Sequence, residues 1–146
     1  MKPMEKSEVE KFIRELEQQL KVVVDFGENL LVKTGEGKIR LVPPDVFEAA
    51  MVMPGVQQMG LYVAKWRRYP TLTIEGCMFL CSADHTAVVE LDREQALTWM
   101  KGGPVDVGKK AQLVIGVYRG FYLGSAVVDR TGRAYPQIPK WRRIPE

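Results

Sequence analysis

The spacing of apolar residues near the start of the chain predicts an amphipathic helix. Ser7-Glu8-Val9-Glu10 has the form of a capping box, in which a hydroxyl and a carboxylate each satisfy a free backbone N–H at the helix start. Apolar residues then recur at helical spacing, so that one stripe faces a core: Val9, Phe12, Ile13, Leu16, Leu20 and Val23. We expect this helix to end at Gly27.

The next segments alternate between short apolar runs and breaks. Residues 29–33 and 38–42 resemble strands, and the glycine-rich residues 34–37 between them predict a hairpin turn. Pro43-Pro44 ends the second strand and suits the first turn of a short helix through Ala50. Residues 56–65 then predict one strand or a bent pair. Residues 71–82 are apolar nearly all round, which fits a buried helix or a buried strand, and we favour the helix.

The pattern becomes rich in strands after residue 84. Residues 87–91 predict a short strand, and Asp92 suits the N-cap of a helix that ends at Gly102-Gly103-Pro104. Residues 111–118 and 121–128 predict two strands joined at Arg119-Gly120, followed by a turn at 129–132. The sequence therefore predicts an α+β fold, with a mixed α/β half at residues 1–83 and a smaller, β-rich half with one short helix at residues 84–146.

Composition places the chain among ordinary globular proteins. It has 146 residues, of which 46% are hydrophobic and 27% charged, and its two cysteines are too few for a disulfide scaffold. The longest nearly uncharged apolar stretch, residues 76–83, is too short to span a bilayer, and residues 1–10 alternate charges where a signal peptide would be apolar. We expect a cytoplasmic, reducing location and no membrane partner.

Charge is unevenly distributed along the chain. Residues 1–100 carry 12 Lys/Arg against 15 Asp/Glu, a net charge of −3, whereas residues 101–146 carry 9 against 3, a net charge of +6. A basic C-terminal third favours a polyanionic partner, although a solvated surface of one sign would look the same.

Motifs that would mark an enzyme are missing from the sequence. It has no phosphate-binding P-loop, no dinucleotide fingerprint and no nucleophile elbow, so we expect neither catalysis nor a cofactor. Cys77, Cys81 and His85 would share one helical face and could approach a metal, but they lack a fourth ligand and a C-x₂-C pair. Buried packing is the better interpretation of these cysteines, and we expect no metal.

Two aromatic–basic clusters indicate nucleic-acid binding. Arginine matches phosphate with a planar fork, and aromatic faces stack on unpaired bases. Each tryptophan could equally pack in the core while its neighbours are solvated. The clusters place an indole among two or three cations: Lys65, Trp66, Arg67 and Arg68 in one, and Lys140, Trp141, Arg142 and Arg143 in the other.

Three short motifs follow one another in the C-terminal half: Trp99-Met100-Lys101-Gly102 at the end of the predicted helix, Leu123-Gly124 in the second strand of the predicted hairpin, and Tyr135-Pro136 followed by basic residues. In their order and positions these motifs resemble a PUA-like domain, in particular the one that ends the rRNA 5-methylcytosine methyltransferases. The resemblance implies a β-barrel with one short helix and binding to rRNA or tRNA. The two-part build is also similar to small archaeal ribosome-biogenesis proteins.

Differences between this sequence and that family limit which of the family's properties the resemblance implies. Its catalytic cysteines follow Pro and Thr, whereas Cys77 follows Gly76 and Cys81 follows Leu80, and no S-adenosylmethionine loop precedes them. The resemblance therefore implies the RNA-binding module alone, acting beside a separately encoded RNA methyltransferase.

The resemblance also implies which residues approach RNA. In PUA-like domains the turn after the first helix lies close to the RNA, a role that Gly102 and Gly103 would fill, with Lys101 placed to meet a phosphate. The same residues would also form an ordinary glycine C-cap. Arg119 and Arg133 are expected to be exposed at turns of the β-rich half.

A protein–protein adaptor is the alternative function. In that case Met51, Met53 and Met59 would dock a methyltransferase or an assembly factor, and contact with RNA would be incidental.

Overall fold

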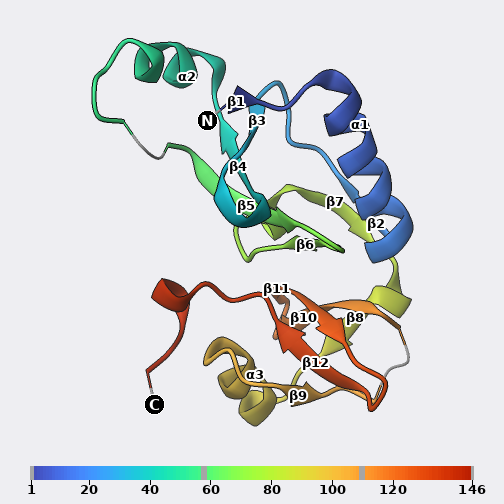
Figure 1. Cartoon of the computed structure of the whole chain (residues 1–146). Coiled ribbons are helices and arrows are strands. Elements are labelled where there is room, and N and C mark those ends of the chain that lie inside the picture. The colour runs from blue at the N-terminus through green and yellow to red at the C-terminus, as the bar shows by residue number, and fades with distance from the viewer. Residues whose placement is uncertain (1, 57–58, 109–110, 146) are drawn as a thin grey trace.

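The computed structural model describes residues 2–56, 59–108 and 111–145, in which three α-helices accompany two five-stranded sheets (Figure 1). The predicted α+β class is confirmed. The first sheet has the order β1-β3-β4-β5-β6, and all of its neighbouring strands are antiparallel. Its strands are β1 (Lys2–Pro3), β3 (Leu30–Lys33), β4 (Lys38–Val42), β5 (Leu61–Trp66) and β6 (Pro70–Leu72).

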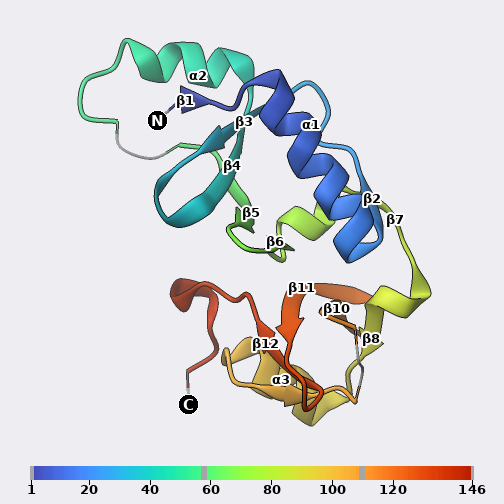
Figure 2. The same cartoon turned by 45° about the vertical axis from the view of Figure 1, so that its right-hand side comes forward.

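The predicted hairpin of this sheet is confirmed. β3 and β4 pair from Leu30↔Val42 to Lys33↔Ile39. Between them, Glu36 and Gly37 adopt φ values of 63° and 75°, which turn the chain sharply. A Cβ on Gly37 would lie 2.7 Å from the Trp66 carbonyl oxygen, so glycine is required where the turn approaches β5. The short helix α2 (Pro44–Met51) follows β4 as predicted and projects from the sheet (Figures 1 and 2).

The first helix begins and ends earlier than the sequence predicted. Its N-cap is Glu5, whose backbone N–H donates to the Glu8 carboxylate at 3.4 Å, so Ser7 is not the cap. α1 (Lys6–Glu15) continues through a π-helical turn at Leu16–Leu20 and ends where Lys21 adopts a φ of 57°. The predicted end at Gly27 is wrong because the β-branched run Val22–Val24 forms a strand, β2, instead.

The prediction of a helix over residues 71–82 is also wrong. This segment contains β6, a 3₁₀ turn at Gly76–Phe79 and β7 (Leu80–Ala83), which pairs with β2. Gly76 explains the tight turn, because a Cβ there would lie 2.0 Å from the Val63 carbonyl oxygen. The segment was expected to be buried, and Leu72 is, but Met78 and Cys81 are exposed.

The C-terminal strands form a curled sheet that resembles half of a barrel (Figure 1). Its order is β8-β10-β11-β12-β9, with β8 and β10 parallel and the other pairs antiparallel. The strands are β8 (Val88–Glu90), β9 (Val105–Asp106), β10 (Leu113–Tyr118), β11 (Phe121–Val128) and β12 (Arg133–Pro136). The predicted pairing of 111–118 with 121–128 is confirmed.

Helix α3 (Arg93–Met100) packs on this curled sheet through its buried residues Ala96 and Trp99. Asp92 caps it as predicted, accepting from the Gln95 backbone at 2.8 Å, while the Gln95 side chain accepts from the Asp92 backbone at 2.9 Å. Trp99 is fully buried, and its indole N–H donates to the Leu123 carbonyl at 2.8 Å. This hydrogen bond fixes α3 against β11.

The two sheets share a packed junction. Leu113 and Ile115 of β10 belong to the same apolar core as Leu16 and Leu72 of the first half. The Ser125 hydroxyl, which is fully buried, accepts from the Leu72 N–H at 2.6 Å and donates to the Leu72 carbonyl at 3.2 Å. The relative position of the sheets is therefore set by side-chain packing as well as by the connecting chain. No helix in the described ranges is both long and apolar enough to cross a membrane.

Candidate nucleic-acid interface

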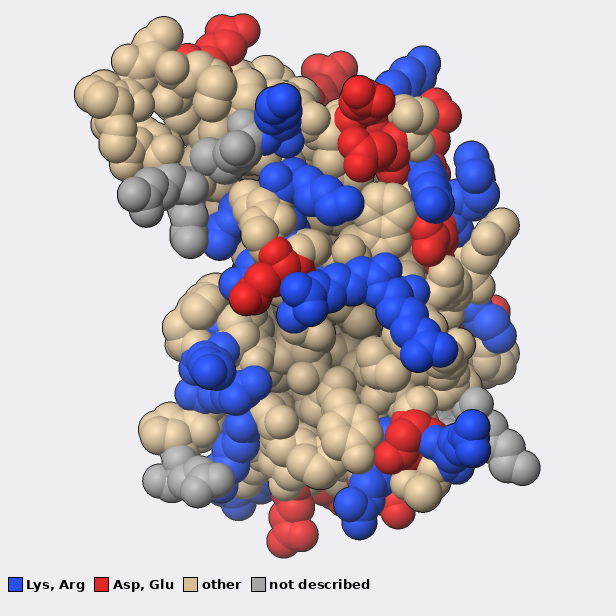
Figure 3. Space-filling model, viewed as in Figure 1, with Lys and Arg blue, Asp and Glu red and all other residues tan. Residues whose placement is uncertain are grey.

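A cationic hollow lies where the two sheets meet. It is formed by the turn between β5 and β6 on one side and by Val127 and Gln137 of the C-terminal half on the other, with a volume of about 170 Å³. The β5–β6 side contributes Lys65, Arg67, Arg68, Tyr69 and Thr71, and no acidic residue lines the hollow in the described part of the chain. Figure 3 shows a band of Lys and Arg side chains crossing this face between the two halves. We call this feature the junction hollow.

Local contacts hold the junction hollow in shape. The Thr71 hydroxyl donates to the Lys65 carbonyl at 3.2 Å across the turn. The Arg68 guanidinium lies 5.4 Å from the ring centre of Tyr69, and the Gln112 side-chain amide donates to the Tyr69 hydroxyl. Arg67 and Arg68 are exposed at the tip of the turn. The structure thus presents cations on a fixed platform, an arrangement suited to a phosphate.

Trp66 of the first aromatic–basic cluster packs inward. Its ring centre lies 5.3 Å from that of Phe12, and it contacts the N-terminal core. The amino groups of Lys11 and Lys33 lie 5.9 and 5.3 Å from its ring centre. A hollow of about 330 Å³ beside it is also lined by Glu8 and Glu15, so its charge is mixed. The packing interpretation therefore describes Trp66 better than a free stacking platform does.

Trp141 of the second cluster has the opposite character. It lies in a 3₁₀ turn (Lys140–Arg142) and is 70% exposed. Arg142 forms an ion pair with Glu75 at 3.0 Å, and its guanidinium lies 5.8 Å from the indole centre. The ion pair ties the C-terminal segment to the first half and partly neutralises Arg142.

The turn after α3 brings predicted site residues together. Gly102 adopts a φ of 79°, and a Cβ there would lie 2.6 Å from Nε of Arg143. The Arg143 guanidinium donates to the Ile138 carbonyl at 3.1 Å, and the Ile144 N–H donates to the Met100 carbonyl at 3.0 Å. The C-terminal segment thus packs on this turn and places Arg143 beside Gly102.

The C-cap interpretation of this turn is confirmed. The Gly102 and Gly103 N–H groups donate to the carbonyls of Trp99 and Thr98 at 2.9 and 3.0 Å. Lys101 is exposed at the helix end.

The two remaining predicted cations are exposed, as expected, but only Arg119 lies in a turn, because Arg133 is the first residue of a strand. Arg119 occupies the tip of the β10–β11 hairpin with a φ of 49° and lies 5.3 Å from the ring centre of Tyr118. Arg133 lies on β12 directly opposite Asp106 of β9, so its surroundings are of mixed charge.

The cysteines lie on different elements. Cys77 is buried, which raises its pKa to about 12, and Cys81 is exposed on β7. Because residues 71–82 do not form one helix, these cysteines and His85 do not share a helical face. Within residues 2–56, 59–108 and 111–145, no cluster of His, Cys, Asp and Glu could hold a metal ion.

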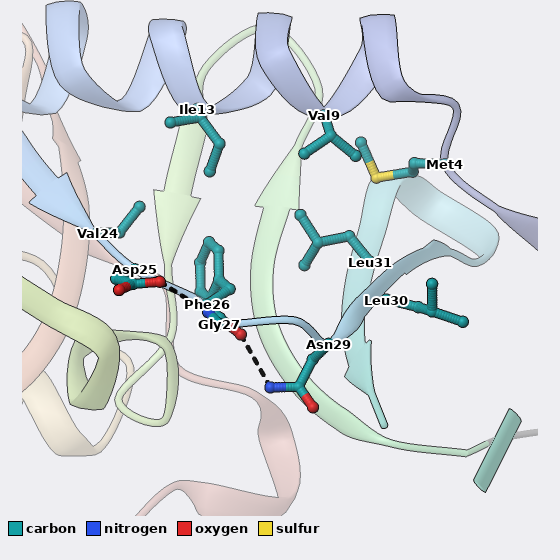
Figure 4. Close-up of a pocket in the computed structure, with 10 residues that line it drawn as sticks. All are labelled: Met4, Val9, Ile13, Val24, Asp25, Phe26, Gly27, Asn29, Leu30 and Leu31. Atoms are coloured by element: carbon teal, nitrogen blue, oxygen red, sulfur yellow. Dashed lines mark hydrogen bonds between the residues drawn. The ribbon is translucent and has the colours of Figure 1, made fainter. Parts of the chain in front are cut away.

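An apolar cavity of about 290 Å³ opens beside α1 and β3 (Figure 4). Asp25 and Asn29 lie at its edge, but each bonds within its own loop: Asp25 accepts from the Gly27 N–H, and Asn29 donates to the Phe26 carbonyl, both at 2.8 Å. The lining is therefore mostly hydrocarbon, and the Asp25 and Asn29 side chains each make one hydrogen bond within their own loop.

Sequence reasoning missed Gln137 and the lysines beside Trp66. Lys33 lies at the end of a predicted strand and Lys11 on the polar face of a predicted helix. The sequence therefore indicated that both are exposed, but not that both lie beside Trp66. Gln137 reaches the junction hollow only through the packing of the two sheets, and no local pattern signals that.

Comparison with known proteins adds no relative. No protein-family model matches the sequence, and no curated protein matches it.

Proposed function

We propose that the chain is a non-catalytic RNA-binding protein of rRNA or tRNA modification or ribosome biogenesis. The observation that carries the proposal is the junction hollow, where Lys65, Arg67 and Arg68 converge with Gln137 and no described acidic residue lines the space. Phosphate contacts of this kind supply much of the affinity of RNA-binding proteins. A hollow formed by both halves would hold a backbone that passes from one to the other.

The proposal includes a PUA-like identity for the C-terminal half. Two features support it: the curled five-stranded sheet, and the one α-helix among the described residues of this half, which ends before Gly102-Gly103 with exposed Lys101 beside it. A separately encoded RNA methyltransferase as partner, and a cytoplasmic location, belong to the same proposal.

The test measures binding to a fluorescein-labelled single-stranded RNA by fluorescence anisotropy. We expect the Arg67→Ala/Arg68→Ala variant to bind more weakly than the wild type. Arg14→Ala removes an exposed arginine from α1, away from the junction hollow, and should leave the affinity unchanged. If both variants lost RNA affinity equally, the loss would be explained by overall charge, which would contradict a defined interface.

The adaptor function is a second candidate because α2 exposes apolar side chains. The helix has no buried residue, and Val46, Met51, Val52 and Met53 are exposed on it and just after it. Isolated apolar residues are common on surfaces, but a contiguous group marks an interaction site. In this case Val52→Asp would abolish a stable protein complex without changing RNA affinity, and Arg67→Ala would leave the complex intact.

A further inference from the structure

The tip of the β10–β11 hairpin exposes an aromatic surface. Arg119 and Gly120 both have positive φ, 49° and 83°, as in the tight two-residue turns that match strand twist. This turn pairs Tyr118 directly with Phe121, so their side chains lie on one face of the hairpin. Side chains alternate along a strand, so Leu123 lies on the same face as Phe121. Phe121 is 72% exposed.

This face continues into an apolar groove of about 250 Å³ between the hairpin and α3. Ala96, Leu97 and Met100 of α3 line it together with Tyr118 and Leu123 of the hairpin, and Ile144 also contributes to the lining. The groove is below the roughly 300–1,000 Å³ of pockets for drug-sized ligands, so it suits one planar ring system. The buried indole of Trp99, bonded to Leu123, holds the walls together.

The charge in the described lining of the groove is positive. Arg93 is the only charged residue in its described lining, and Arg119 covers the ring of Tyr118 in its wall. Lys101 and Arg143 adjoin the lining residues Met100 and Ile144 along the chain. Glu94 lies on another side of α3, where it lines a separate hollow with Thr98 and Asp106. A ligand that suits this site is therefore a flat, largely apolar group carried on an anion.

The C-terminal segment connects the groove with the junction hollow. Gln137 lines the junction hollow and Ile144 lines the groove, and the residues between them include Lys140, exposed Trp141 and Arg143. A single strand of RNA could follow this segment from one site to the other.

We propose that the α3–hairpin groove binds one unpaired nucleobase of RNA, stacked on Phe121 and Tyr118, while Arg93 and Arg119 hold its flanking phosphates. This inference rests on the proposed RNA-binding function and deepens it. It specifies single-stranded RNA as the ligand, because a base inside a duplex cannot enter the groove.

The experiment compares two fluorescein-labelled probes, an oligouridylate and an abasic oligomer of the same length that carries the same phosphates. The wild type should bind the oligouridylate more tightly. Phe121→Ala should weaken that binding by about 5- to 150-fold, the equivalent of about 1–3 kcal/mol, and leave binding of the abasic oligomer unchanged. Leu97→Asn should act in the same direction.

Val46→Asn is the matched control, since Val46 is exposed to the same degree as Leu97 (43% and 40%) but lies on α2. Thermal melting should show all three variants folded, because each changes an exposed side chain. If Phe121→Ala and Leu97→Asn bind the oligouridylate as tightly as the wild type does, the groove does not bind a base. If Arg67→Ala/Arg68→Ala binds it more weakly in the same experiment, the proposed RNA-binding function still stands. A wild type that binds neither probe would overturn both, and the groove would then suit an apolar side chain of a protein.

Discussion

At the scale of single residues, Ser125 shows how one hydroxyl joins the two halves. It accepts from the N–H and donates to the C=O of Leu72, and all of these groups are buried. A serine inside a predicted strand gave no sign of this role, because its partner lies 53 residues away. Long-range pairing of this kind has no local pattern in a sequence.

Ser125→Ala should lower the free energy of unfolding by about 1–3 kcal/mol, since it leaves buried polar groups of Leu72 without this partner. Urea denaturation measures the change. Ser82→Ala removes an exposed hydroxyl from β7 and should stay within about 0.5 kcal/mol of the wild type. If the two variants were equally stable, the Ser125 bridge would contribute nothing to the junction.

Asp129 organises the turn between β11 and β12. Its carboxylate accepts from the Thr131 hydroxyl at 2.6 Å, from the Arg133 N–H at 3.1 Å and from the Tyr135 hydroxyl at 3.1 Å. These hydrogen bonds, that of the Thr131 hydroxyl first, lower the pKa of Asp129 from 3.8 to about 2. The predicted turn at 129–132 is confirmed, and its sequence offered the Asx-turn chemistry that stabilises it.

The lowered pKa of Asp129 predicts a pH effect on stability. The folded state binds fewer protons than the unfolded state between pH 3.8 and about 2, so the contribution of Asp129 is complete above that window and is lost as the pH falls through it. Asp129→Asn should therefore show a smaller loss of unfolding free energy across this window than the wild type. Identical pH profiles for the two proteins would contradict the hydrogen-bonded carboxylate.

At the scale of elements, segments with a strong local signal were predicted and ambiguous ones were not. The capped helix at Arg93–Met100 and the hairpin of β10 and β11 carry their own capping and turn residues. In contrast, an apolar run such as residues 71–82 has no period that separates strand from helix, and only contact with β5 and β2 decides. Two-residue strands such as β1 and β9 are too short for any pattern.

The packing of α3 on β10 depends on the absence of a side chain at Gly116. A Cβ at this position would lie 2.8 and 2.9 Å from ring carbons of Trp99. Gly116→Ala should therefore destabilise the fold by about 1–3 kcal/mol through overpacking. Calorimetric or urea unfolding would measure the loss.

Gly35→Ala is the control for that substitution. A Cβ at Gly35 meets nothing within 4 Å, and its φ is not in the left-handed range, so stability should be unchanged or slightly higher. A Gly116→Ala variant as stable as Gly35→Ala would show that α3 can shift away from β10.

At the scale of the whole molecule, the candidate interface is more dispersed than the clusters in the sequence suggested. Lys65, Arg67 and Arg68 were predicted together and do converge in the junction hollow. Trp66, predicted beside them, packs on Phe12 instead, because alternation along β5 separates it from Lys65. Arg143 of the C-terminal cluster lies beside Gly102, the residue that follows Lys101. Charge and residue type were readable from the sequence, whereas which cations share a surface depended on how the two sheets pack.

The central claim is that an RNA backbone crosses the junction hollow, and the salt dependence of RNA affinity tests it most directly. For single-stranded RNA, the logarithm of the affinity should fall with the logarithm of salt concentration at a slope of about −0.7 per phosphate contacted. Arg67→Ala/Arg68→Ala should make this slope shallower by roughly one to two contacts across different RNA sequences, while Arg14→Ala leaves it unchanged. If the Arg67→Ala/Arg68→Ala variant keeps both the affinity and the salt slope of the wild type, RNA does not cross the junction hollow.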